Sequence, residues 1–361
     1  IPIRSSYTPD QGFNMEANST ALESTNLSLL LPSNSKTDVS RAMDIVRACI
    51  YSAVLILGSL GNGMVIWITA CQTSRTVNCV WFFHLAVADF LFSMSRILPF
   101  LRYAFFEDWP FGSFLCRANT FIKYLNMFCS VFLLATISVD RAALVTYPIW
   151  TKNHRAPRLA WFAALGVWFM AVATSLPFYF YRNVIRKDNK TKCYLVTEGR
   201  DSIKLTLCFL RLFCGFLAPF AIIIICYGII TIVLRSRQAT LRSNKPFKVI
   251  LAIVVTFFLC WAPYHFFVLL ECAKVNMQFL SVGLPLASCL AYLNSCANPI
   301  LYFFIGLDYH KKLGHLNLVA AFRRALLEDS AYSLTKSNKE RRQEISSTNE
   351  LDSSTAAEQV L

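Results

Sequence analysis

Long apolar runs alternate with short polar segments along this chain of 361 residues. A hydrocarbon core about 30 Å thick takes about 20 apolar helical residues to cross, and seven runs approach or exceed that length. They cover 48–71, 79–95, 118–139, 159–181, 205–234, 249–270 and 279–307. The pattern predicts an all-α membrane protein, with a seven-transmembrane helix bundle over 48–304.

Both ends of the chain are polar. Residues 1–47 and 325–361 are rich in Ser, Asn and Thr and are expected to be disordered. Between bundle and tail, 305–324 is expected to hold a short amphipathic eighth helix on the inner leaflet. The first 20 residues lack an apolar core, so the first span is the expected insertion signal, and Met15 is an alternative start to Ile1.

Composition argues against a water-soluble enzyme, since 55% of residues are hydrophobic and only 16% charged. No phosphate loop, nucleophile–base pair or metal-ligand spacing is visible, so neither an enzyme nor a metal cofactor is expected. The net charge of +14 would also suit nucleic acid or a membrane surface. However, the Lys and Arg flank the spans, which makes nucleic acid an unexpected partner.

The charges do not set the orientation, because 14 Lys and Arg lie near the spans on each face. Glycosylation sequons at Asn18, Asn26 and Asn189 all fall on the amino-terminal side. They predict an extracellular amino terminus, and therefore an unusually basic outer face.

One carboxylate, Asp89, lies inside an apolar run, where a lone charge is costly. Oxygen-bearing side chains that could surround it in a polar cavity include Asn126, Ser130, Asn294 and Asn298. These residues are compatible with a sodium ion that biases a conformational switch, or with a protonated, hydrogen-bonded structural Asp89.

Two cations, Lys123 and Arg211, lie inside the outer halves of their spans. The only acidic residue in those outer halves is Glu271, and buried cations need a partner, so an anionic guest is predicted. The predicted site combines these three with the rim cations and tyrosines that could line an apolar slot, namely Arg182, Lys192, Tyr124, Tyr194 and Tyr264. Alternatively, Lys123 and Arg211 extend towards the surface.

Seven motifs together resemble the signatures of rhodopsin-like G-protein-coupled receptors. They are Gly61-Asn62, Leu85 to Asp89, Asp140-Arg141, Trp168, Pro219 with Tyr227, Cys260 to Pro263, and Asn298-Pro299 with Tyr302. The resemblance implies a plasma-membrane receptor with no enzymatic activity and a disulfide between Cys116 and Cys193. It also implies switch roles for Trp261 and Tyr302, and G-protein coupling through Asp140, Arg141 and Tyr227. A plain surface ion pair is the alternative for Asp140 and Arg141.

Within that family, the segment from Tyr147 to Arg155 resembles the chemoattractant branch, and several segments look nearest to the chemoattractant-type prostaglandin D receptor. This resemblance implies an acidic lipid ligand, an inhibitory heterotrimeric G protein, arrestin at the tail, and a role in chemotaxis or inflammation. Lys123, Leu195 and a shorter stretch from Cys193 to Arg211 depart from the prostaglandin pattern.

A chemoattractant peptide of the formyl-peptide or complement-fragment type is therefore the alternative ligand. Formyl-peptide receptors usually have an acid and a second Arg where this chain has Tyr124 and Leu207. The inner basic surface could also bind anionic lipid headgroups alone, and the tail could be plain disordered chain. A transporter is the alternative from a different class, although no inverted repeat is visible.

Overall fold

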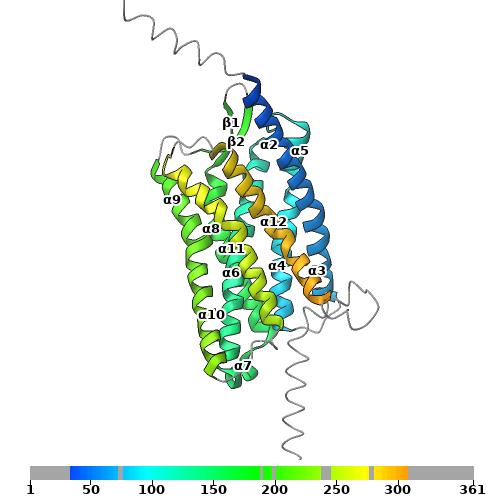
Figure 1. Cartoon of the computed structure of the whole chain (residues 1–361), viewed down its shortest axis with the longest axis vertical. Coiled ribbons are helices and arrows are strands. Elements are labelled where there is room, and N and C mark those ends of the chain that lie inside the picture. The colour runs from blue at the N-terminus through cyan, green and yellow to red at the C-terminus, as the bar shows by residue number, and fades with distance from the viewer. Residues whose placement is uncertain are drawn as a thin grey trace, which may run out of the picture. The chain divides into compact units, whose positions relative to one another are not determined.

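The computed structural model describes residues 33–71, 76–187, 190–196, 201–236, 245–275 and 280–307; within these, the side chains of 33–40, 187, 245–249 and 302–307 are not described. The chain divides into two units between Ile45 and Val46. The second unit holds the helix bundle, with a β-hairpin at one end and the short helix α7 at the other (Figure 1).

The described residues contain seven helical segments long and apolar enough to span a bilayer, which confirms the predicted fold class. They are formed by α2 (Ser33–Ala53) with η1 (Val54–Gly58) and α3 (Ser59–Cys71), α4 (Val77–Ser95) with α5 (Ile97–Phe105), α6 (Gly112–Thr146), α8 (Pro157–Phe180), α9 (Asp201–Leu212) with η2 (Phe213–Leu217) and α10 (Ala218–Ser236), α11 (Lys245–Cys272), and α12 (Leu280–Leu307). Helix α7 covers Pro148–His154.

Most of the helices extend beyond their apolar runs. Helix α6 has 35 residues, so at about 1.5 Å per residue it is far longer than the hydrocarbon core. Helix α2 likewise begins at Ser33, so the expectation of disorder up to residue 47 is wrong for 33–47. Apolar content marks the part of a helix that faces lipid, whereas the hydrogen-bonded helix continues into the polar layers.

An antiparallel hairpin departs from the all-α expectation. Strands β1 (Arg182–Lys187) and β2 (Lys190–Leu195) pair with Arg182 opposite Leu195 and Val184 opposite Cys193. Their sequences are too polar to show a clear alternation of apolar and polar positions, so the strands could not be recognised from pattern alone.

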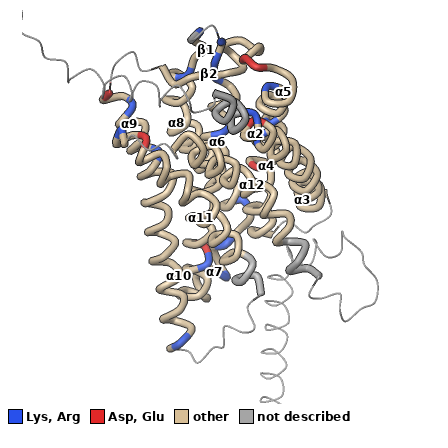
Figure 2. The backbone as a smooth tube through the Cα atoms, turned by 45° about the horizontal axis from the view of Figure 1, so that its top comes forward, with Lys and Arg blue, Asp and Glu red and all other residues tan. Residues whose placement is uncertain are grey.

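Helix α6 is the centre of the bundle and packs against α4, α8, α10 and α11. Large apolar side chains on the outside of the bundle are highly exposed, for example Phe169 at 76% and Phe162 at 72%. Such exposure suits contact with lipid. Lys and Arg gather mainly towards the two ends of the bundle (Figure 2).

Candidate functional site

The hairpin end of the bundle contains a cluster of two cations and two phenols. Helix α6 contributes Lys123, eleven residues after Gly112, and α9 contributes Arg211, ten residues after Asp201. Each cation therefore lies about 15 Å along its helix from the hairpin end. Tyr264 comes from α11.

The π-turn η2 begins two residues after Arg211, at Phe213. Pro219 has no N–H to donate to Gly215, and the wider turn η2 occupies this interval. A side chain at Gly215 would place its Cβ only 2.7 Å from Cε of Met127 on α6. Gly215 thus lets this turn approach α6 closely, about one helical turn from Lys123 and Tyr124.

The cluster is built on the phenol oxygen of Tyr264. Arg211 Nη1 donates to it at 2.9 Å and Lys123 Nζ at 3.2 Å, while Arg211 Nη1 also donates to the Tyr124 oxygen at 3.0 Å. In the part of the chain that the structure describes, neither cation has an acidic partner within ion-pair distance. Both cations point into the bundle, which contradicts the alternative that they extend towards the surface.

Two cavities open around this cluster. The first, of about 420 Å³, and the second, of about 470 Å³, share eight lining residues, including Lys123 and Tyr124. All eight predicted ligand-binding residues line one or both: Lys123, Tyr124, Arg182 and Tyr194 line both, Lys192 lines the first, and Arg211, Tyr264 and Glu271 line the second. The predicted set is therefore brought together in space.

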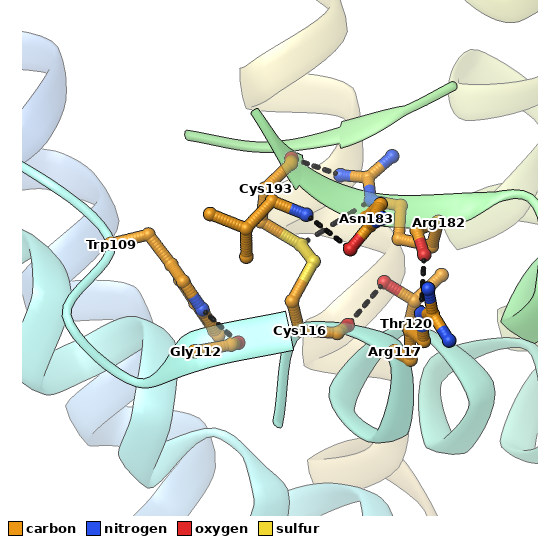
Figure 3. Close-up of a disulfide and its surroundings, with 9 residues drawn as sticks. Trp109, Gly112, Cys116, Arg117, Thr120, Arg182, Asn183 and Cys193 are labelled. Carbon is orange, nitrogen blue, oxygen red and sulfur yellow. Dashed lines mark hydrogen bonds between the residues drawn. A yellow bond between two sulfur atoms is a disulfide. The ribbon is translucent and has the colours of Figure 1, made fainter. Parts of the chain in front are cut away.

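A disulfide attaches the hairpin to α6. Cys116 and Cys193, the pair that the resemblance implied, are joined in the structure (Figure 3). The guanidinium of Arg182 donates to the Cys193 carbonyl at 2.9 Å, and Arg117 donates to the Arg182 carbonyl at 3.0 Å. Arg182 thus lines both cavities and also stabilises the hairpin above them.

Sequence reasoning missed three cations of the first cavity, which lie on α2, at the α4–α5 break and on α5. Arg47, Arg96 and Arg102 all line it. Arg96 and Arg102 lie beyond the second apolar run, 79–95, so the hydropathy pattern does not place them in the bundle. The helical continuation through α5, from Ile97 to Phe105, was the signal that could have placed them in the bundle wall.

Asp89 is fully buried in the middle of the bundle. Its two carboxylate oxygens accept from Asn126 Nδ2 and Asn298 Nδ2, each at 2.8 Å. Three of the predicted sodium ligands keep buried oxygens without a hydrogen-bond partner among the described residues: Ser130 Oγ, Asn294 Oδ1 and Asn298 Oδ1. A carboxylate with neutral oxygens is the donor chemistry that hard cations prefer, so these residues fit a sodium ion.

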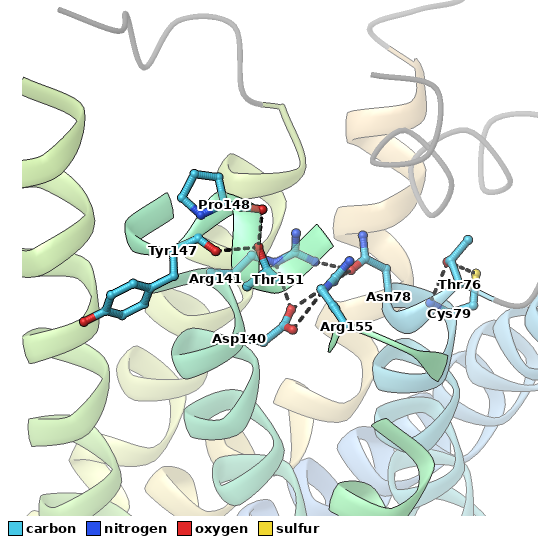
Figure 4. A network of polar contacts seen from close by, with 9 residues as sticks. All are labelled: Thr76, Asn78, Cys79, Asp140, Arg141, Tyr147, Pro148, Thr151 and Arg155. Atoms are coloured by element: carbon cyan, nitrogen blue, oxygen red, sulfur yellow. Dashed lines mark hydrogen bonds and ion pairs between the residues drawn. The ribbon is translucent and has the colours of Figure 1, made fainter. Parts of the chain in front are cut away.

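Asp140 and Arg141 lie at the opposite end of α6 and do not form a simple surface pair. Arg155, just after α7, donates to both Asp140 oxygens at 2.9 Å and to Asn78 at 2.7 Å, and Arg141 also donates to Asn78 (Figure 4). Arg141 Nε lies 3.9 Å from Asp140. The closest partner of Asp140 is therefore Arg155, a residue that the sequence did not single out.

The other predicted switch and coupling residues divide into described and undescribed positions. Trp261 is buried beside Tyr264, with ring centroids 5.6 Å apart, and Tyr227 is half-buried on α10. The side chain of Tyr302 lies outside the described residues, as do Asn18, Asn26 and Asn189, most of 305–324, and all of 325–361.

Comparison with known proteins gives the decisive match. The model for "7 transmembrane receptor (rhodopsin family)" matches residues 61–302, which is most of the bundle just described. The chain belongs to this family. It is therefore a multi-pass receptor of the plasma membrane with an extracellular amino terminus, and its family is not an enzyme family. The hairpin and both cavities lie on the extracellular side, and the Asp140 network lies on the cytoplasmic side.

Relatives of this rhodopsin-family receptor are chemoattractant-type receptors. Chemerin-like receptor 1 of Homo sapiens is 41% identical over 317 residues, covering 81% of this chain and 83% of the relative. The C3a anaphylatoxin chemotactic receptor of Oncorhynchus mykiss is 38% identical over 298 residues, covering 80% and 81%. The fMet-Leu-Phe receptor of Pongo pygmaeus is 35% identical over 306 residues, covering 80% and 88%.

Proposed function

We propose that this receptor binds a chemoattractant peptide through a free carboxylate and signals through a heterotrimeric G protein. The observation that carries the proposal is the convergence of Arg211 and Lys123 on the phenol oxygen of Tyr264, with no acidic partner for either cation among the described residues. A guanidinium forks onto a carboxylate, and the neighbouring ammonium adds a second charge-assisted donor. An incoming carboxylate would replace a neutral acceptor with a charged one.

The relatives favour a peptide over a lipid. The names of those reported above include chemerin, C3a and fMet-Leu-Phe, and none refers to a prostaglandin. Two adjoining cavities of about 420 and 470 Å³ can also accept several side chains. An acidic lipid of the prostaglandin D type is the second candidate, supported by the sequence segments that resemble that receptor and by the aromatic residues near Arg211.

Helix α11 connects the proposed ligand site to the cytoplasmic side. Tyr264 lies one turn from Trp261, and Pro263 between them removes a backbone hydrogen bond that would hold the helix straight. A ligand carboxylate that competes for Arg211 and Lys123 changes the bonds to Tyr264. We propose that this change biases α11 between two positions, with sodium at Asp89 favouring the resting one.

The cytoplasmic partners are also proposals. The resemblance to the chemoattractant branch supports an inhibitory G protein that docks near Asp140, Arg141 and Tyr227, with arrestin binding the tail. Anionic lipid headgroups are the expected neighbours of the remaining inner cations.

Arg211→Ala tests the carboxylate site. Cells expressing the receptor are screened for inhibition of cyclic AMP with prostanoids and with formylated and carboxy-terminal peptides, each peptide made as free acid and as amide. The substitution is expected to abolish most of the response to an active free acid while surface expression stays intact. Arg186→Ala, an exposed hairpin residue that lines neither cavity, is the matched control. Unchanged potency at Arg211→Ala would refute the site.

A further inference from the structure

The first cavity has a cationic wall that the carboxylate site does not use. Arg96 lies at the break between α4 and α5 and is only 2% exposed, yet it lines this cavity. From this break its side chain reaches the first cavity, whose other lining residues come mainly from α2, α5, α6, α12 and the hairpin.

Within the described residues, the contacts of the Arg96 side chain are all with neutral groups. Its Nη2 donates to Ser95 Oγ and to Asn119 Oδ1, each at 2.9 Å, and the guanidinium lies over the rings of Phe92 at 4.3 Å and Tyr292 at 5.2 Å. Its Nε has no partner, and across the described ranges no carboxylate lies within ion-pair distance. A desolvated cation that has only neutral contacts attracts an anion.

The charges of the surrounding wall reinforce this. The first cavity is lined by six cations and by no Asp or Glu among the described residues: Arg47, Arg96, Arg102, Lys123, Arg182 and Lys192. Glu271 lines only the second cavity. Cationic walls of low dielectric focus the field into the space between them, which favours an anion there. The part of the first cavity beside Arg96 is called the Arg96 arm below, and the part of the second cavity beside Arg211 is called the Arg211 arm.

The two arms form one continuous site. Lys123, Tyr124, Leu284 and Ser288 line both cavities, and Lys123 therefore stands between Arg96 and Arg211. One ligand can pass across Lys123 and reach both arginines.

We propose that the Arg96 arm is a second anion subsite and that this receptor prefers ligands with two carboxylates, one bound at Arg211 and Lys123 and the other at Arg96. The inference rests on the proposed function, since it takes the Arg211 site as the first anchor. A peptide with a free carboxyl terminus and one acidic side chain has this chemistry, and so does a long dicarboxylic acid.

Matched probes measure the value of the second charge. Each probe is a hexapeptide of apolar residues that ends in a free Phe carboxylate and carries a single Glu at one of its four internal positions. Its matched partner carries Gln at the same position. Dodecanedioate and dodecanoate form the corresponding lipid pair. Binding is read from the concentration-dependent rise in melting temperature of the purified full-length receptor in nanodiscs, which reports ligands of unknown efficacy.

At one Glu position, or for the diacid, the second carboxylate is expected to tighten binding at least tenfold over the matched monoanion. Arg96→Gln should remove that advantage while monoanion binding stays unchanged, whereas Arg211→Gln should weaken both. Arg186→Gln controls for the loss of one positive charge.

Asn119→Asp provides a second test that does not remove Arg96. The new carboxylate is nearly isosteric with the amide whose oxygen already accepts from Arg96, and it would neutralise the subsite. It should abolish the preference for dianions and leave the receptor folded. If Arg96 is only structural, Asn119→Asp should keep the preference for dianions.

The outcomes separate the two proposals. Monoanions that bind and depend on Arg211, with no gain from any second carboxylate, overturn the Arg96 subsite alone. A gain that persists in both Arg96→Gln and Asn119→Asp also overturns it. If no free acid binds better than its amide, the carboxylate site and the subsite both fail. A gain with the Glu and Gln hexapeptides indicates the ligand chemistry of a peptide. A gain with dodecanedioate over dodecanoate indicates that of a lipid.

Discussion

At the scale of single residues, Tyr264 is the centre of the candidate site. Its hydroxyl oxygen accepts from Arg211 and from Lys123, so both acceptor lone pairs are used and its own proton is left to donate. The Tyr124 oxygen, 3.5 Å away, can accept that proton. Two half-buried cations therefore depend on a few neutral phenol oxygens until an anion arrives.

Tyr264→Phe should make the ligand-free receptor less stable. Removing the shared oxygen deprives Lys123 of the Tyr264 acceptor and leaves Arg211 with Tyr124, at a cost of about 1–3 kcal/mol. The melting temperature of the purified receptor should fall. A bound free-acid ligand should raise the melting temperature of this variant by more than it raises that of the unchanged receptor. Tyr194→Phe, whose ring also lines the cavities, is the control. An unaltered melting temperature would show that the oxygen is not needed.

At the scale of elements, the helices approach closely where side chains are small. Gly58 ends the π-turn η1, and a Cβ there would lie 2.2 Å from Oγ and 2.9 Å from Cβ of Ser93 on α4. Close approach through small residues is a common way for helices to pack in a membrane. This contact holds the first helix against the second, next to the polar centre at Asp89.

Gly58→Ala should therefore destabilise the bundle. The added methyl overlaps Ser93 and forces η1 and α4 apart, and overpacking of this kind costs about 1–3 kcal/mol. Gly166→Ala is the matched control, because a Cβ at Gly166 meets nothing within 4 Å. Thermal denaturation of both variants gives the comparison, and equal melting temperatures would contradict the packing argument.

The loop after α7 is the second element whose contacts matter. Arg155 binds both oxygens of Asp140 and the side chain of Asn78, and thereby connects the ends of α6, α4 and α8 (Figure 4). Asp140 is half-buried, so this bidentate pair is stronger than an exposed one.

Arg155→Ala should raise agonist-independent activity. Without Arg155 the end of α6 loses a two-bond anchor, and the resting arrangement of Asp140 and Arg141 becomes less favourable. Nucleotide exchange on a purified inhibitory G protein, measured without ligand, should increase several-fold. The exposed Arg158 on α8 offers the control substitution Arg158→Ala. Basal exchange that stays the same in both variants would remove Arg155 from this role.

At the scale of the whole molecule, positive charge predominates around the two cavities at the extracellular end of the bundle. Eight cations and one acid line the two cavities. The summed field reaches beyond the opening and steers anions towards it, but salt screens it over about 10 Å at 0.1 M.

Association of a free-acid ligand should accordingly slow as salt rises. Between about 20 and 300 mM sodium chloride the association rate constant is expected to fall several-fold, with a smaller change in dissociation. Stopped-flow fluorescence of a labelled peptide can measure both rate constants. The amidated peptide serves as the comparison, and an equal salt dependence for acid and amide would argue against steering.

The sequence by itself determined the seven spans, the family and most of the candidate site residues. Hydropathy is a local property, so runs such as 159–181 could be placed to within a few residues, and the motifs carried the family resemblance. The prostaglandin resemblance was less informative, because the relatives named above carry the names of other ligands.

Only the tertiary structure decided which residues meet. Lys123 and Tyr264 are 141 residues apart, and their contact depends on how α6 and α11 rotate and pack. Three further features likewise depend on where one element ends beside another: the hairpin, the contact of Arg155 with Asp140, and the place of Arg96 in the cavity wall. Hydropathy reports which residues enter the membrane, whereas side-chain packing between helices determines which of them face one another.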